Sequence, residues 1–119
     1  MRLQDIFYEL LSMREVDGGF EADVRLIPDN VIFKAHFPGF PITPGACLIR
    51  IVGELVGKHV ENDVVLSAIK NVKFLNVVIP SENMKLFVDV KVDSQLKVQA
   101  VVRDESSVFT KMSLQYSLK

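Results

Sequence analysis

Two groups of residues in this chain have side chains suited to acid–base chemistry. His36 stands in the segment AHFPGFPITPG, residues 35–45. Its imidazole exchanges a proton near neutral pH, so it is a candidate general base. Farther along, Arg50, Glu54 and Lys58 are four residues apart, which places them in one polar stripe on a helix. Arg50 stays protonated near neutral pH, so it can hold a carboxylate or a substrate oxygen but cannot shuttle a proton.

Each of these residues also has a purely structural interpretation. His36 could simply bond the backbone of its loop, and Arg50 with Glu54 could form an exposed ion pair worth only about 0.3–0.5 kcal/mol. Cys47 stands where a helix dipole could lower its pKa, but its apolar neighbours favour a buried packing role. No Cys/His spacing typical of a zinc site occurs in the sequence, so we expect no metal and no cofactor.

The hydrophobic pattern predicts the elements that must position these groups. The segment that contains His36 has three prolines and two glycines in eleven residues, which fixes a defined irregular backbone. Residues 46–59, ACLIRIVGELVGKH, are apolar around nearly the whole circumference of a helix, which predicts a helix surrounded by protein. Gly53 and Gly57 lie four apart on this helix and would let a neighbouring backbone approach closely.

Around this helix the pattern predicts a second, short helix and several strands. Leu3 to Leu11 has apolar residues at helical spacing, and FEADVRLI, residues 20–27, alternates like a half-buried strand. Four more candidate strands follow the long helix as an antiparallel meander: residues 64–78, 85–92, 96–103 and 109–118. Because a sheet that must bury one apolar helix curls around it, we expect an α+β fold.

Length and composition set the frame for these elements. The chain of 119 residues has no linker-like segment, so we expect one domain over residues 1–119. Hydrophobic residues make up 49% and charged residues 24%, which argues against disorder, and a net charge of -1 gives no case for nucleic-acid binding. We expect no membrane span and no signal peptide, and the single cysteine fits a reducing compartment; the expected location is cytoplasmic.

Two segments of the chain resemble a known family. The sequence HFPGFPITPG, residues 36–45, resembles the HFPGxPxxPG signature of the 3-hydroxyacyl-carrier-protein dehydratases. Residues 68–92, AIKNVKFLNVVIPSENMKLFVDVKV, are similar to the strand and proline turn that follow in that family. The resemblance covers the chain from about Phe20 onward, and it rests on three prolines and two glycines in register.

The resemblance implies a hot-dog fold, in which a long antiparallel sheet wraps around a central buried helix. It also implies a homodimer or higher homo-oligomer whose sheets join side by side, with acyl tunnels at the subunit interface and an acyl carrier protein as partner. His36 would be the base at C2 of a 3-hydroxyacyl thioester, and the Gly45 N–H would bind the thioester carbonyl. Substrate contacts would come from the motif loop: Phe37, Phe40 and Pro44.

At one position this sequence departs from the family pattern. The family carries a catalytic Glu or Asp fourteen residues after the histidine, and here that residue is Arg50. Glu54, one helical turn later, is our candidate for the displaced acid, with Arg50 holding it or the substrate oxygen. Two alternatives stay open: a hot-dog thioesterase in which Glu54 activates water, and a non-catalytic acyl-binding or partner subunit that has lost the carboxylate.

Overall fold

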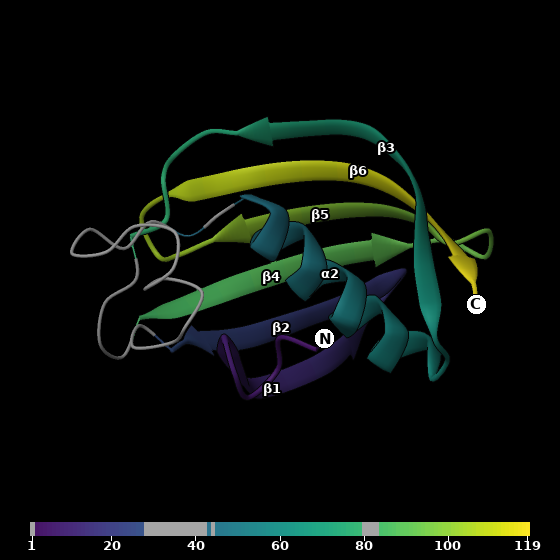
Figure 1. Ribbon diagram of the computed structural model, residues 1–119, viewed down its shortest axis with the longest axis horizontal. Helices are drawn as coiled ribbons and strands as arrows, with labels where there is room; N and C mark the ends of the chain where they lie inside the picture. Colours follow the sequence, from purple (N-terminus) through teal and green to yellow (C-terminus); the bar gives the residue numbers. More distant parts are fainter. Residues whose placement is uncertain (1, 28–42, 44, 80–83) are drawn as a thin grey trace.

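One antiparallel sheet and one long helix make up the described part of the chain. The computed structural model describes residues 2–27, 43, 45–79 and 84–119. Six strands form the sheet in the order β1-β2-β4-β5-β6-β3, and α2 crosses one face of it (Figure 1). The elements in chain order are β1 (Tyr8–Val16), β2 (Gly19–Leu26), α2 (Gly45–Val60), β3 (Val64–Phe74), β4 (Lys85–Val92), β5 (Lys97–Arg103) and β6 (Val108–Leu118). The expected α+β class is confirmed.

The core lies between α2 and the sheet face that it covers. In β2, β4 and β5 every second side chain is buried, as the alternation of apolar and polar residues predicts. The helix contributes one apolar face: Cys47, Leu48, Ile51, Val52, Leu55 and Val56. Arg50 and Lys58 on the opposite face are exposed. In the described structure the helix is therefore covered on one side, and the prediction of a helix surrounded by protein is not met.

The predicted N-terminal helix over Leu3 to Leu11 is wrong. Residues 5–7 form a turn in which the Phe7 N–H donates to the Leu3 carbonyl, and β1 begins at Tyr8. Asp5, with a φ of 67°, is in the left-handed region and cannot continue a helix. Pairing with β2 decides the structure here, because it buries Tyr8 opposite Leu26. A register shift between Leu10 and Ser12 breaks the strand alternation, so the sequence did not reveal this strand.

The predicted meander is correct only for its last three strands. β4, β5 and β6 are consecutive neighbours, whereas β3 pairs with β6 at the far edge of the sheet. β3 ends at Phe74 rather than at Val78, and two register shifts interrupt its ladder. Most of its side chains are exposed. No helix among the described residues is long and apolar enough to cross a membrane.

Candidate active site

The sequence-predicted site residues divide into those that the structure describes and those that it does not. His36, Phe37, Phe40 and Pro44 lie outside the described residues. Gly45, Arg50 and Glu54 lie on α2, at its first, sixth and tenth positions. No group of three potential metal ligands occurs in the described ranges, whose gaps are 28–42, 44 and 80–83.

Gly45 opens α2, where the first backbone N–H groups have no partner within the helix. The residue lies against the aromatic ring at the end of β3: a Cβ atom on Gly45 would lie 2.5 Å from Cζ of Phe74. Just before the helix, the Thr43 N–H donates to the Val78 carbonyl at 2.9 Å, which ties the start of α2 to the segment after β3. A residue without a side chain therefore lets the helix N-terminus and Phe74 meet.

Glu54 holds the N-terminal segment of the chain. Its carboxylate accepts hydrogen bonds from the backbone N–H of Leu3 at 2.6 Å and of Gln4 at 3.0 Å, and from the Tyr8 hydroxyl at 3.0 Å. Burial, followed by the nearby Glu54 charge, raises the pKa of Tyr8 well above its ordinary range, so the phenol remains a donor. The side chain of Glu54 is 13% exposed. This carboxylate has a structural role that the sequence did not indicate.

Arg50 is only loosely tied to Glu54. Its Nη2 atom lies 4.0 Å from Glu54 Oε2, at the outer limit of an ion pair, and its side chain is 49% exposed. A guanidinium group carries five N–H donors, and among the described residues the long contact with Glu54 engages at most one of them. The three members of the predicted stripe, Arg50, Glu54 and Lys58, all line one groove beside α2.

This groove has a volume of about 790 Å³ and runs along the face of α2 that the sheet does not cover. Gly53 and Gly57 on the helix add no side chains to its lining. Its other wall comes from β3 and β6: Val64, Leu66 and Tyr116. Gly57 is approached by the turn that follows its own helix, since a Cβ there would lie 3.2 Å from the Asn62 carbonyl oxygen, and Gly53 is approached by the Tyr116 side chain rather than by a neighbouring backbone.

Tyr116 is the groove residue that the sequence analysis missed. Tyr116 is 4% exposed, and its hydroxyl makes no hydrogen bond within the described part of the chain. The phenol lies over Gly53, where a Cβ would be 3.2 Å from Oη. Burial raises the pKa of Tyr116 to about 12. The glycine at position 53 was the one signal that another group could approach the helix closely. The sequence does not show that this group is Tyr116, which lies 63 positions later.

Cys47 has the packing role that its apolar neighbours predicted. It is a free cysteine in the core beneath the first turn of α2. Burial raises the pKa of its thiol, and the Arg50 charge offsets this only in part. The thiol therefore stays protonated near neutral pH and is unsuited to act as a nucleophile.

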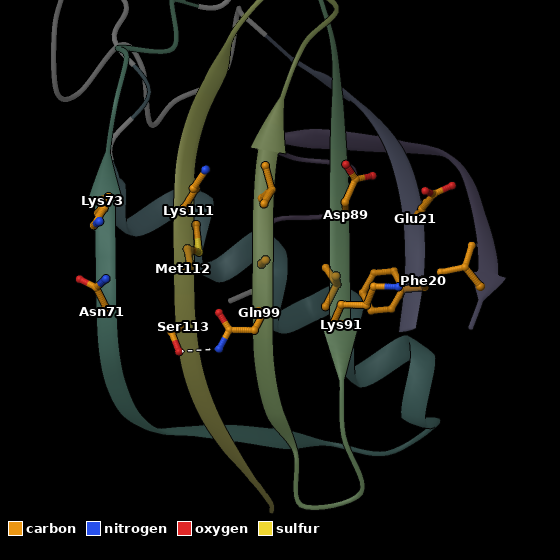
Figure 2. A pocket seen from close by; sticks show the side chains of 14 residues that line it. Phe20, Glu21, Asn71, Lys73, Asp89, Lys91, Gln99, Lys111, Met112 and Ser113 are labelled. Carbon is orange, nitrogen blue, oxygen red and sulfur yellow. Dashed lines mark hydrogen bonds between the residues drawn. The ribbon is translucent and has the colours of Figure 1, made fainter. Parts of the chain in front are cut away.

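A second cavity, of about 420 Å³, lies over the sheet face turned away from α2 (Figure 2). Lys73 on β3 stands directly opposite Lys111 on β6, and both line this cavity. Asp89 is bonded to Arg103 at 2.7 Å, and Gln99 donates to Ser113 at 2.8 Å. None of the sequence-predicted site residues that the structure describes lines this cavity. Arg50 and Glu54 line the groove beside α2, although Gly45 does not, and this groove is therefore the candidate active site.

Comparison with known proteins agrees with the resemblance of the motif. The family model described as "ApeI-like: ApeI dehydratase" matches residues 12–113. A 3-hydroxyacyl-[acyl-carrier-protein] dehydratase FabZ from Lactiplantibacillus plantarum is 30% identical over 122 residues, covering 89% of this chain and 83% of that enzyme. FabZ from Clostridium acetobutylicum is 35% identical over 66 residues, which cover 50% of this chain and about half, 47%, of that enzyme.

Solved structures share the fold. A chain of "The Dehydratase Heterocomplex ApeI:P from Xenorhabdus doucetiae" superposes with a TM-score of 0.78 at 18% identity, covering 91% of this chain and 96% of that one. An uncharacterized protein from Erwinia carotovora subsp. atroseptica has a TM-score of 0.64 at 17% identity, covering 92% and 93% of the two chains. The expected hot-dog fold, a sheet wrapped around a central helix, is confirmed.

Proposed function

Because the chain belongs to the ApeI-like dehydratase family, we propose that it eliminates water from 3-hydroxyacyl thioesters carried on an acyl carrier protein, in fatty-acid or related acyl-chain synthesis. The observation that carries this proposal is the start of α2. Gly45 opens the helix at the end of the dehydratase-like motif, where the first N–H groups have no partner within the helix, and the groove lies farther along the same helix, from Ile49 onward. The FabZ relatives named above act, by their names, on acyl-carrier-protein substrates.

The chemistry assigns a role to each group. In the proposed reaction His36 removes a proton from C2, and the charge that develops on the thioester oxygen is stabilised by the Gly45 N–H and the positive end of the α2 dipole. The bond between C3 and its oxygen then breaks, and the oxygen leaves as water once it has received a proton. Phe37, Phe40 and Pro44 would contact the acyl chain.

The last proton needs a donor near the C3 oxygen. Arg50 stands where the resemblance puts the acid, and arginine stays protonated. Glu54 is our sequence-based candidate, but its oxygens accept three hydrogen bonds from the N-terminal segment. To act as the acid, Glu54 would have to give up part of this anchoring role, which weakens the case for it.

We also propose that the functional form is a homodimer or a larger homo-oligomer joined through β3. This strand has a partner on one side only, and the described residues near its free edge include large exposed apolar side chains: Val65, Leu66, Ile69, Phe74, Leu75, Val77 and Ile79. Monomeric proteins rarely expose large apolar patches, and an unpaired strand edge is a template for pairing. Joining two such edges side by side would cover both.

A partner subunit without its own activity is the second candidate function. Arg50 in place of the acid favours it, and the ApeI dehydratase of Xenorhabdus doucetiae is itself found in a heterocomplex. In this case the chain would bind acyl thioesters and pair with a related chain that has the carboxylate. Copurification with such a chain, with turnover only in the mixture, would distinguish this function from that of a self-sufficient dehydratase.

The decisive experiment follows two products at once. Purified protein is incubated with a 3-hydroxyacyl-carrier-protein substrate, and enoyl thioester and free thiol are measured beside the His36→Ala variant. Enoyl product that disappears in the variant is the expected result. Free thiol without enoyl product would mean a thioesterase. No product of either kind from folded protein would contradict the dehydratase proposal and favour the partner subunit.

A further inference from the structure

Lys73 on β3 and Lys111 on β6 stand opposite each other on the sheet face turned away from α2 (Figure 2). Both residues are exposed, and neither has a carboxylate within ion-pair distance in the described part of the chain. Directly opposite residues on antiparallel strands have Cβ atoms only about 4.5–5.5 Å apart, so two like charges in this position destabilise the sheet. Strand pairing alone therefore does not explain why two lysines stand here.

The acidic side chains on the same face are already paired within the chain. Across the sheet from Lys111, beyond β5, Asp89 accepts a hydrogen bond from Arg103 at 2.7 Å. One strand farther, Glu21 accepts a hydrogen bond from Arg14 at 3.1 Å. These carboxylates are therefore neutralised by their own arginines, and the positive charge at the β3–β6 end of this face stays uncompensated among the described residues.

Three neutral polar side chains border the two lysines and line the same cavity of about 420 Å³. Asn71 on β3 stands opposite Ser113 on β6, and Ser113 stands opposite Gln99 on β5. Asn71 and Ser113 are two positions from Lys73 and Lys111, so all four side chains share one face. The Gln99 amide donates to the Ser113 oxygen at 2.8 Å, so the Ser113 O–H can still donate into the cavity. The cavity thus combines two positive charges with hydroxyl and amide donors.

We propose that this cavity binds a phosphate group between Lys73 and Lys111, either inorganic phosphate or the phosphate of a small phosphorylated molecule. Near neutral pH a phosphate monoester carries a charge of about −1.5 to −2, which matches two ammonium groups, whereas a carboxylate would balance only one. Its oxygens accept charge-assisted hydrogen bonds from the lysines and further bonds from the neutral donors beside them. The phosphate would bridge β3 and β6 and replace the repulsion between the lysines with two attractions.

The size and place of the cavity favour a small ligand that is independent of the dehydratase chemistry. Its volume of about 420 Å³ lies within the range of small-molecule sites, about 300–1,000 Å³. Lys91, the third lysine of the lining, stands on β4, two strands away from Lys111, and donates to the Asp17 carbonyl at 2.9 Å. The phosphate site is therefore the β3–β6 end of the cavity, across the sheet from the groove beside α2.

Phosphate binding would reverse the sign of the contribution that the lysine pair makes to stability. Without a ligand the two charges repel each other and lower the stability of the folded protein. A ligand that needs both lysines in place binds the folded protein and stabilises it. Salt can screen the repulsion but cannot make the pair attractive. A stabilising contribution of the pair in phosphate, and not in chloride, is therefore the signature of the site.

The test compares the melting temperatures of the wild type and the Lys111→Gln variant in chloride and in phosphate of equal ionic strength. In chloride we expect the variant to melt at the same temperature as the wild type or higher. In phosphate we expect the order to reverse, with the wild type melting higher. Calorimetric titration of inorganic phosphate should show binding to Lys111→Gln and to Lys73→Gln about tenfold weaker than to the wild type.

A second titration, with glycerol phosphate, distinguishes the two sources of the phosphate group. Tighter binding of glycerol phosphate than of inorganic phosphate would identify a small phosphorylated molecule as the ligand, and tighter binding of inorganic phosphate would identify the free ion. Either result supports the phosphate site, provided that both lysine variants weaken the binding.

Lys97→Gln is the matched control, because Lys97 is an exposed lysine on β5 that does not line the cavity. We expect it to change the affinity for phosphate by less than about twofold. The inference is overturned if the order of melting temperatures does not reverse in phosphate, if neither ligand binds, or if Lys97→Gln weakens binding as much as Lys111→Gln does. Each of these results leaves the proposed dehydratase function standing, because that function does not use this face of the sheet.

Discussion

At the scale of single residues, the carboxylate of Glu54 shows how one side chain can be given two different roles. Helical spacing put it beside Arg50 in the candidate site, and the structure agrees that both line one groove. The same carboxylate also receives two backbone N–H groups and a phenol from the N-terminal segment. A change at this residue therefore affects folding as well as any chemistry, and the two effects must be measured separately.

Replacing Glu54 with glutamine should destabilise the protein. The amide of the variant keeps one acceptor oxygen. Its NH₂ group would face a backbone N–H that in the wild type donates to the carboxylate, and the negative charge is lost. We expect a loss of about 1–3 kcal/mol in the free energy of unfolding, measured by urea denaturation. Glu105→Gln is the control, because Glu105 is exposed. Equal stability of the two variants would show that Glu54 does not anchor the N-terminal segment.

The buried phenol of Tyr116 predicts a loss of stability at alkaline pH. Its pKa is about 12 in the folded protein against 10.0 for an ordinary tyrosine. Above pH 10 the unfolded chain loses this proton while the folded protein keeps it, so folding becomes less favourable as the pH rises toward 12. In this window we expect the free energy of unfolding of the Tyr116→Phe variant to rise relative to that of the wild type by roughly 1.4 kcal/mol per pH unit. Denaturation from about pH 9 to about pH 11 measures this difference. A constant difference would mean that the pKa is not raised.

At the scale of elements, the sequence predicts those strands whose alternation is uninterrupted. FEADVRLI and LFVDVKV show the period of two without a break, and both are strands in the structure. β1 has a register shift after Leu10, and its first residues follow a tight turn, so its pattern imitates a helix. The place of β3 beside β6 was not predictable, because pairing order depends on contacts between residues far apart in the chain.

The same limit applies to the candidate site. Spacing along one helix was enough to bring Arg50, Glu54 and Lys58 together, since the helical repeat alone fixes their common face. Contacts that join different elements were missed: Tyr116 over Gly53, Phe74 over Gly45, and the N-terminal N–H groups on Glu54. Each of these pairs is separated by 29 to 63 positions in the sequence, so no local pattern contains it.

Where β3 pairs with β6, two lysines face each other across the strands. Lys73 and Lys111 are directly opposite, and both are exposed. Like charges in this arrangement destabilise a sheet, so Lys111→Glu should stabilise the protein by about 0.2–1 kcal/mol at low salt. The gain should shrink as salt screens the charges, and urea denaturation at two ionic strengths measures both effects. Lys97→Glu, on the exposed end of β5, is the control. A gain that salt does not reduce would contradict an electrostatic origin.

At the scale of the whole molecule, the two edges of the sheet differ in what they expose. β1 forms one edge and β3 the other (Figure 1). Polar residues of α2 and residues of β3 line the same groove. Large apolar side chains are exposed on β3 and the segment that follows it, whereas fewer are exposed near β1. An interface through β3 would therefore also cover the side of the molecule that carries the groove, and would link assembly to the site.

Assembly through β3 predicts an asymmetric response to charge at the two edges. Ile69 on β3 is 53% exposed, and Leu11 on β1 is 47% exposed, so each can take a charged residue without entering the core of the protomer. We expect Ile69→Asp to shift the protein from dimer to monomer, because a carboxylate would be buried without a partner in the joined interface. Leu11→Asp should leave the dimer intact. Sedimentation velocity over a range of concentrations measures both variants beside the wild type. A wild type that is monomeric throughout, or a dimer that survives Ile69→Asp but not Leu11→Asp, would show that β3 is not the edge through which the chain assembles.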